Sequence, residues 1–72
     1  MEELRAPMVG RIIEVMVQPG ARVEEEDEVL MLESIKMQIP ITVTRAATIG
    51  EVRVSVGDTV QEGDVLAVID EA

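Results

Sequence analysis

The stretch that decides the fold is RIIEVMVQPGARVEEEDEVLMLES, residues 11–34, which returns in related form as TIGEVRVSVGDTVQEGDVLAVIDE at residues 48–71. The two copies align without a gap at a spacing of 37 positions, so that Gly20 falls on Gly57 and Asp27 on Asp64. Each copy has an alternating apolar stretch, a glycine turn, a short apolar segment, an acidic turn and a continuous apolar run. We therefore predict two structural halves related by a pseudo-twofold axis.

Apolar residues in the chain recur with a period of two, which is typical of strands. Alternating stretches occupy residues 11–18, 37–44 and 51–56, and continuous apolar runs at 29–32 and 65–69 suit strands that are buried on both faces. In the first stretch, Ile13, Val15 and Val17 would share one face, with Ile12 on the other. Turn residues separate the strands at Pro19-Gly20, Gly57-Asp58 and Glu62-Gly63-Asp64.

Several short strands with regular turns, and no 3.6-residue period, predict an all-β sandwich or flattened barrel. Pro40 has no N–H, so its strand should lie at a sheet edge or its nitrogen should point outward. The 72 residues suffice for one small domain, residues 1–72, whose ends at Met1–Leu4 and Glu71–Ala72 are expected to fray.

The composition excludes several classes of function. Cysteine and histidine are absent, which rules out disulfides, the common zinc ligand sets and imidazole-based catalysis. So short a chain can hardly enclose a substrate cleft, and an independent enzyme is not expected. A net charge of −9 with scattered arginines argues against nucleic-acid binding. No apolar segment is long enough to span a membrane and no signal-peptide pattern is present, so the expected compartment is the cytoplasm.

Lys36 is the single lysine, and it lies between the two halves in Glu33-Ser34-Ile35-Lys36-Met37-Gln38. If the flanking strands pair as a hairpin, Lys36 sits at the tip, within reach of another enzyme's active site. A lone lysine at a turn is in most proteins only a solvated charge. Apolar flanks at an exposed turn instead indicate a binding surface, although Met37 could equally pack into the core.

The run Glu33-Ser34-Ile35-Lys36-Met37 resembles the biotin-attachment motif of biotinyl domains, usually Glu-Ala-Met-Lys-Met or Glu-Ser-Met-Lys-Met. Ala6-Pro7-Met8-Val9-Gly10 is similar to the opening segment of that family, and Gly–x–x–Val turns recur in both halves, so the resemblance covers nearly the whole chain. The family fold is a flattened barrel of two four-stranded antiparallel sheets, with the lysine on a hairpin at one end.

The resemblance implies that Lys36 carries covalent biotin and that a biotin protein ligase recognises Glu33, Ser34, Ile35 and Met37. For Glu33 alone, a solvated carboxylate at a strand end is the simpler interpretation. Biotin on such a carrier accepts a carboxyl group at a biotin carboxylase and delivers it at a carboxyltransferase. The implied role is therefore that of a non-catalytic carrier in a carboxylase, transcarboxylase or decarboxylase system.

Three positions depart from the family pattern. Ile35 replaces the usual Met and is stiffer at χ1, which should slow ligation. Glu26 and Ala47 stand where Gly is usual, and each would be strained if its position needs a positive φ. The stretch between Gly10 and Gly20 is too short for a protruding thumb loop, so the chain resembles the thumbless carriers of pyruvate and acyl-CoA carboxylases, transcarboxylases and decarboxylases, and small free-standing carriers.

Two alternatives remain open. A lipoyl carrier shares the fold, but it usually has Asp before the lysine and a small residue after it, whereas Ile35 and Met37 favour biotin. The second alternative is an unmodified β-scaffold that only binds a partner. A mass measurement separates it from either carrier, because it has no group attached to Lys36. The other methionines considered, Met8 and Met16, are expected in the core.

Overall fold

The computed structural model describes residues 2–71 as strands joined by turns, with no helix among them. Within that range no segment therefore forms a helix that could cross a membrane. The strands are β1 (Glu2–Arg5), β2 (Gly10–Val15), β3 (Arg22–Val23), β4 (Glu28–Ser34), β5 (Met37–Thr42), β6 (Ala47–Val52), β7 (Thr59–Val60) and β8 (Val65–Glu71).

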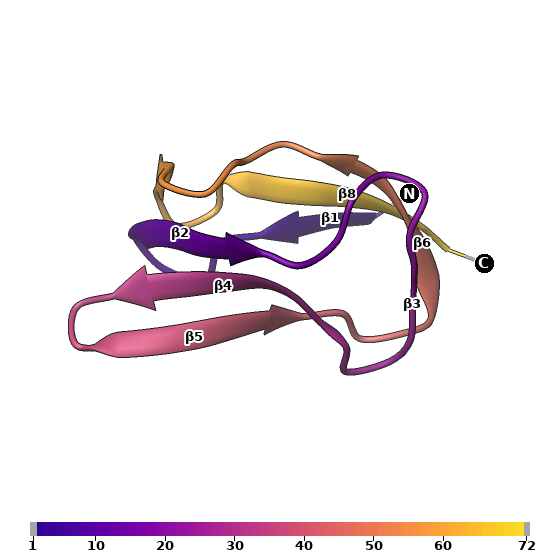
Figure 1. Cartoon of the computed structure of the whole chain (residues 1–72), viewed down its shortest axis with the longest axis horizontal. Coiled ribbons are helices and arrows are strands. Elements are labelled where there is room, and N and C mark those ends of the chain that lie inside the picture. The colour runs from indigo at the N-terminus through magenta and orange to yellow at the C-terminus, as the bar shows by residue number, and fades with distance from the viewer. Residues whose placement is uncertain (1, 72) are drawn as a thin grey trace.

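The strands form two four-stranded sheets in which every pairing is antiparallel. The hairpin sheet has the order β5-β4-β2-β7 and the terminal sheet has the order β1-β8-β6-β3. Figure 1 shows the two sheets stacked as layers, with most of their strands running along the long axis of the molecule. The expected all-β fold of two four-stranded antiparallel sheets is confirmed. Pro40 lies in β5, an edge strand of the hairpin sheet, as its missing N–H predicted.

Strand pairing reproduces the sequence repeat residue by residue. In the terminal sheet Arg22 of β3 pairs with Thr48 of β6, and in the hairpin sheet Thr59 of β7 pairs with Arg11 of β2. Each partner in the second pair lies 37 positions from its counterpart in the first. Each half thus gives its shortest strand to the sheet of the other half, as a pseudo-twofold axis requires.

The core lies between the sheets and consists of aliphatic side chains. No polar or charged side chain is buried among the described residues. The largest fully buried side chains are Ile12, Leu30, Leu32, Ile49, Leu66 and Ile69. Val23 and Val60, which form the short apolar segments of the two repeats, are also buried. The expectation that Met8 and Met16 belong to this core is wrong, because their exposed fractions are 37% and 39%.

A β-bulge interrupts the alternation in both halves at equivalent positions. The register shifts between Ile12 and Glu14 in β2, and between Ile49 and Glu51 in β6. An extra residue at a bulge reverses the facing of the side chains that follow it. Ile12, before the bulge, is fully buried, and Val15 and Val17, after it, also pack against the core. The expected place of Ile12 on the face opposite Val15 and Val17 is therefore wrong.

Four turns recur with the same geometry, and each is closed by a 3.0 Å backbone hydrogen bond from the N–H of its fourth residue to the carbonyl of its first. They span residues 18–21, 24–27, 55–58 and 61–64. The third residue has a positive φ in all four, and only the second turn uses a side-chain-bearing residue there, Glu26 at 71°. The strain expected at Glu26 is therefore present. Ala47 has no positive φ and packs fully buried in β6.

Some strand ends differ from those expected. β2 ends at Val15 rather than at residue 18. β6 spans Ala47–Val52 rather than residues 51–56, so this strand begins and ends earlier in the chain than expected. Single backbone hydrogen bonds from Met16 to Val29 and from Arg53 to Leu66 continue these strands briefly before the chain turns.

The expected fraying at Met1–Leu4 and Glu71–Ala72 is wrong where the structure describes these ends. Glu2–Arg5 forms β1 and pairs with β8, which extends to Glu71. Leu4 packs against the core, which fixes β1 in place. Met1 and Ala72 lie outside the described residues.

Candidate functional site

Lys36 lies at the tip of the hairpin between β4 and β5. Ser34 pairs with Met37, which leaves Ile35 and Lys36 as a two-residue loop. Figure 1 shows this hairpin extending from one end of the molecule, whereas β1 begins and β8 ends at the opposite end. The hairpin tip predicted from the sequence is thus the outermost point of the fold on that side.

The backbone and side chain of Lys36 both set it apart. Its φ of 63° lies in the left-handed region, which costs an L-residue roughly 1–2 kcal/mol. Glycine or asparagine normally occupies the third position of such a turn. The side chain is exposed and takes part in no hydrogen bond or ion pair with any residue in the range 2–71. The structure therefore presents a primary amine that no neighbour holds.

Two apolar side chains flank this amine and both face solvent. The exposed fraction of Ile35 is 86% and that of Met37 is 58%. Met37 therefore does not pack into the core, which was the alternative left open by the sequence. An exposed apolar pair beside a reachable amine is a feature that a partner protein can recognise.

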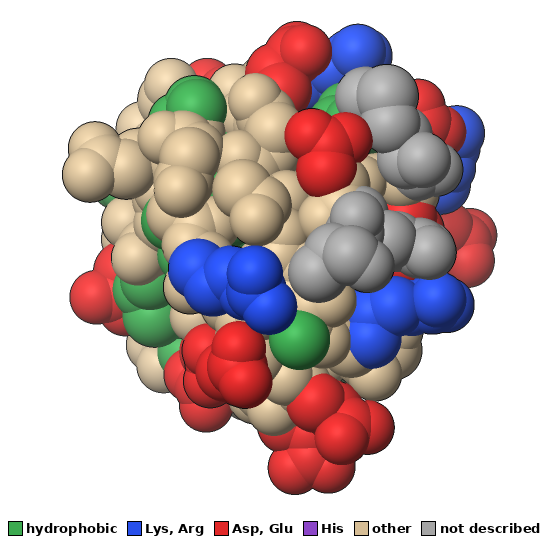
Figure 2. Space-filling view, turned by 90° about the vertical axis from the view of Figure 1, so that its right-hand side faces the viewer, with side chains coloured by type: hydrophobic (Ala, Val, Ile, Leu, Met, Phe, Trp, Pro, Cys, Tyr) green, Lys and Arg blue, Asp and Glu red, His purple; other side chains and the backbone are tan. Residues whose placement is uncertain are grey.

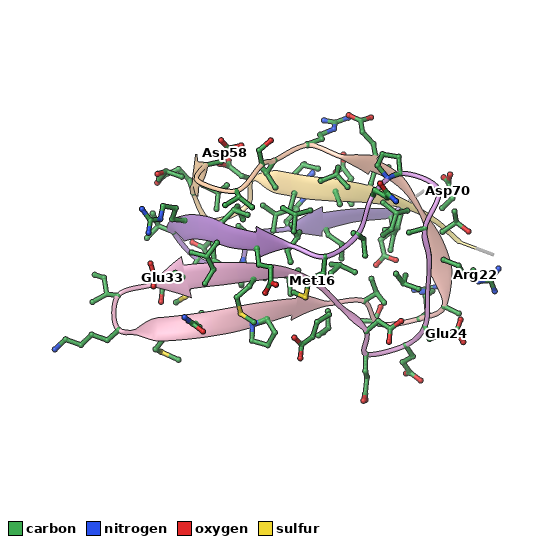
Figure 3. All side chains as sticks on the ribbon, viewed as in Figure 1. Met16, Arg22, Glu24, Glu33, Asp58 and Asp70 are labelled. Atoms are coloured by element: carbon green, nitrogen blue, oxygen red, sulfur yellow. The ribbon has the colours of Figure 1, made fainter. Side chains whose placement is uncertain are left out.

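Glu33 lies near the end of β4 that leads into the hairpin tip, as Figure 3 shows, and it has a partner. Its Oε1 atom lies 3.4 Å from Nη2 of Arg11 on the neighbouring strand β2. Both side chains are largely exposed, so this pair contributes little to stability. Ser34, half-buried, lines a hollow of about 420 Å³ together with Glu33, Lys36, Met37 and Gln38. Arg11 was missed in the sequence because only the strand register reveals its place opposite Glu33.

Gly10 permits the close approach of β2 to β4 beneath the hairpin. A Cβ atom at this position would lie 2.6 Å from the carbonyl oxygen of Glu33 and 2.9 Å from Cδ1 of Leu32. No side chain fits into that space without moving the strands apart. The sequence identified Gly10 only as the end of the opening segment.

Comparison with known proteins places this geometry in a family. The biotin/lipoyl family model, described as "Biotin-requiring enzyme", matches residues 2–69. The biotinylated protein TB7.3 homolog of Mycobacterium leprae is 43% identical over 68 residues, which cover 94% of this chain and 96% of the relative. The mitochondrial propionyl-CoA carboxylase alpha chain of Homo sapiens is 43% identical over 63 residues, covering 88% of this chain but 9% of that protein.

A relative with a different named cofactor also matches. The dihydrolipoyllysine-residue acetyltransferase component of the pyruvate dehydrogenase complex from Pseudomonas aeruginosa is 37% identical over 67 residues, or 88% of this chain and 12% of that protein. The chain thus spans about a tenth of this relative and of the human carboxylase chain.

Solved structures show the same architecture. A single-chain, multi-domain long-chain acyl-CoA carboxylase superposes with a TM-score of 0.93 at 31% identity, over 99% of this chain and 7% of that one. The lipoyl domain of the 2-oxoglutarate dehydrogenase complex from Azotobacter vinelandii gives 0.85 at 22% identity, over 99% and 98% of the two chains. The second likeness concerns the fold alone. With the family model matching nearly its whole length, the chain belongs to the biotin/lipoyl attachment domain family.

Proposed function

We propose that this chain carries biotin on Lys36 and moves a carboxyl group between a biotin carboxylase and a carboxyltransferase. The observation that carries the proposal is the unpartnered amine of Lys36 at the hairpin tip, between the exposed side chains of Ile35 and Met37. Relatives named as a biotinylated protein and as a biotin carboxyl carrier protein support biotin as the attached group.

In the attachment step, a biotin protein ligase would use ATP to activate the biotin carboxyl group. Nζ of Lys36 attacks the activated carboxyl carbon, an amide bond forms, the activating phosphate-containing group leaves and the amine loses a proton. The chain itself contributes placement, because the two-residue loop fixes the lysine Cα while its side chain remains free to enter the ligase. Glu33 and Ser34 would belong to the segment that the ligase recognises.

Once attached, biotin would supply the carboxyl-carrying chemistry, and the chain would remain a non-catalytic carrier. Residues 1–72 would act as one attachment unit. The hairpin lies at the end of the molecule away from the start of β1 and the end of β8 (Figure 1). A carrier of this shape can be held at one end while its biotin reaches partner active sites at the other.

A lipoyl carrier is the second candidate, because a relative named for its dihydrolipoyllysine residue shares 37% identity. The neighbours of the lysine should decide between the two. In a mixture of biotin ligase and lipoate ligase with both cofactors, the unmutated chain should take biotin far faster than lipoate. The Ile35→Asp and Met37→Ala double variant should shift toward lipoylation, since it replaces two exposed side chains that a ligase can read. Intact mass distinguishes the two products.

A double variant outside the hairpin serves as the control for this competition. Val56→Asp with Met16→Ala makes the same types of change at two other exposed positions. It should keep the preference for biotin. Efficient lipoylation of the unmutated chain would reverse the choice of cofactor.

A further inference from the structure

Two exposed apolar residues outside the hairpin occur in the connection between β1 and β2. Met8 is 37% exposed and Val9 is 52% exposed. In Figure 1 β1 runs toward the hairpin end of the molecule and β2 starts there, so this connection lies at that end. Together with Ile35 and Met37, these residues are four of the six large apolar residues that are exposed in the described part of the chain.

The strand register brings Val9 next to the hairpin tip. Arg11 pairs with Glu33, and Gly10 approaches the backbone of β4 so closely that a Cβ atom would touch the Glu33 carbonyl. Val9 directly precedes Gly10, so it lies beside the end of β4 that leads into Ile35 and Lys36. The β1–β2 connection and the hairpin tip are therefore neighbours at this end of the molecule.

The opposite end of the molecule has a different character. Figure 2 shows acidic and basic side chains spread over that face, with few hydrophobic ones among them. The ion pair between Arg22 and Glu24 lies there, as the labels of Figure 3 show. At the hairpin end Glu33 pairs with Arg11, and Asp58 also lies at this end, as Figure 3 shows. The exposed apolar side chains, rather than an absence of charge, are therefore what this surface has in common with the centre of a protein interface.

We propose that Met8, Val9, Ile35 and Met37 form one docking surface for the ligase that acylates Lys36, a surface that extends beyond the attachment motif itself. This inference rests on the proposed function. It extends ligase recognition from the hairpin to the connection between β1 and β2.

The reach of the lysine side chain identifies the ligase as the occupant. Five single bonds take Nζ about 6 Å from Cα, so a ligase that acts on the free amine must cover the residues immediately around Lys36. After attachment, the acyl chain of biotin extends the reach roughly twofold by the same bond lengths, and a carboxylase can act without touching this surface.

The test measures biotinylation of the Met8→Ser and Val9→Ser double variant over a range of carrier concentrations, by intact mass with ligase, ATP and biotin. KM should rise about tenfold with kcat unchanged, because the surface acts in docking before the chemical step. The matched control is Met16→Ser with Val56→Ser, the same substitutions at exposed positions outside the surface. Its KM should stay at the unmutated value.

Circular dichroism checks that both double variants are folded. Should the Met8→Ser and Val9→Ser protein prove unfolded, the single Val9→Glu variant replaces it and should raise KM in the same way. Once fully biotinylated at high concentration, the variant should be carboxylated by a biotin carboxylase at the unmutated rate.

Three outcomes separate this inference from the function on which it rests. Equal KM values for the unmutated chain and the Met8 and Val9 variant would overturn the docking surface and leave biotinylation of Lys36 standing. The docking surface would also be overturned if the Met8 and Val9 variant lost more activity in the carboxylation step than in ligation. A ligase that modifies none of the proteins, including the unmutated chain, would contradict the proposed function itself.

Discussion

The Lys36→Ala variant should keep the all-β circular dichroism spectrum of the unmutated chain and lose carboxyl transfer completely. Its side chain has no partner in the described structure, so its removal leaves every contact of the hairpin in place. The carrier role, by contrast, depends wholly on the Nζ atom. The measurement is the incorporation of labelled bicarbonate into the ligase-treated protein, with ATP and a biotin carboxylase, followed by delivery with a carboxyltransferase.

Gln38→Ala is the matched control, because Gln38 is an exposed residue on the same hairpin. It should retain both incorporation and delivery. Labelled carboxyl on the Lys36→Ala protein would contradict the assignment of this lysine. Incorporation into the biotinylated chain with no partner enzyme present would contradict its role as a carrier.

Gly10→Ala should lower the free energy of unfolding by about 3 kcal/mol, the upper part of the range for overpacked positions. The new Cβ would lie 2.6 Å from the Glu33 carbonyl oxygen and 2.9 Å from the fully buried Leu32 side chain. Backbone cannot give way as a flexible side chain can, so β2 must separate from β4. A domain of this size rarely has more than about 5 kcal/mol of stability, and urea unfolding should show a large fall in the midpoint.

Gly50→Ala tests whether the effect is specific to that close approach. Like Gly10, Gly50 lies within a strand and has no positive φ, but its added Cβ would meet a carboxylate oxygen of Asp70 and the backbone carbonyl of Val68, both at 3.3 Å. These contacts are short by only a few tenths of an ångström, against the 2.6 Å contact at Gly10, so the loss should stay below about 1 kcal/mol. Equal losses for the two variants would mean that the contact of Gly10 with β4 is not what requires glycine.

The repeat at residues 11–34 and 48–71 predicted the architecture because a duplicated sequence folds into duplicated pairings. The match of the Arg22–Thr48 pair with the Arg11–Thr59 pair is the direct result. Lys36 was likewise predictable at the hairpin tip, since β4 ends at Ser34 and β5 begins at Met37, with only two residues between them.

Features that depend on contacts distant in sequence could not be read from local patterns. β1 forms because its backbone pairs with β8, 60 or more positions away, and Glu2 and Glu3 give no local sign of it. The bulge after Ile12 reverses which side chains face the core. Met8 appeared suited to the core by residue type, and only its place in the β1–β2 connection shows that it is exposed.

The backbone of Lys36 was not foreseen either. Its positive φ lies at a turn position where glycine or asparagine is the usual signal, and a lysine there gives no such signal. The attachment motif predicted which residue would be exposed, but not the left-handed conformation that holds it at the tip.

The most direct measurement is the intact mass of the protein after incubation with a biotin ligase, ATP and biotin, with the modified residue located by peptide mass spectrometry. The unmutated chain should gain one biotinyl group, on Lys36, and the Lys36→Arg variant should gain none, because no other side-chain amine exists in the sequence. A known carrier in the same reaction confirms that the ligase is active. A biotinyl group on the Lys36→Arg protein, or an unmodified native chain beside a fully modified known carrier, would contradict the proposed function.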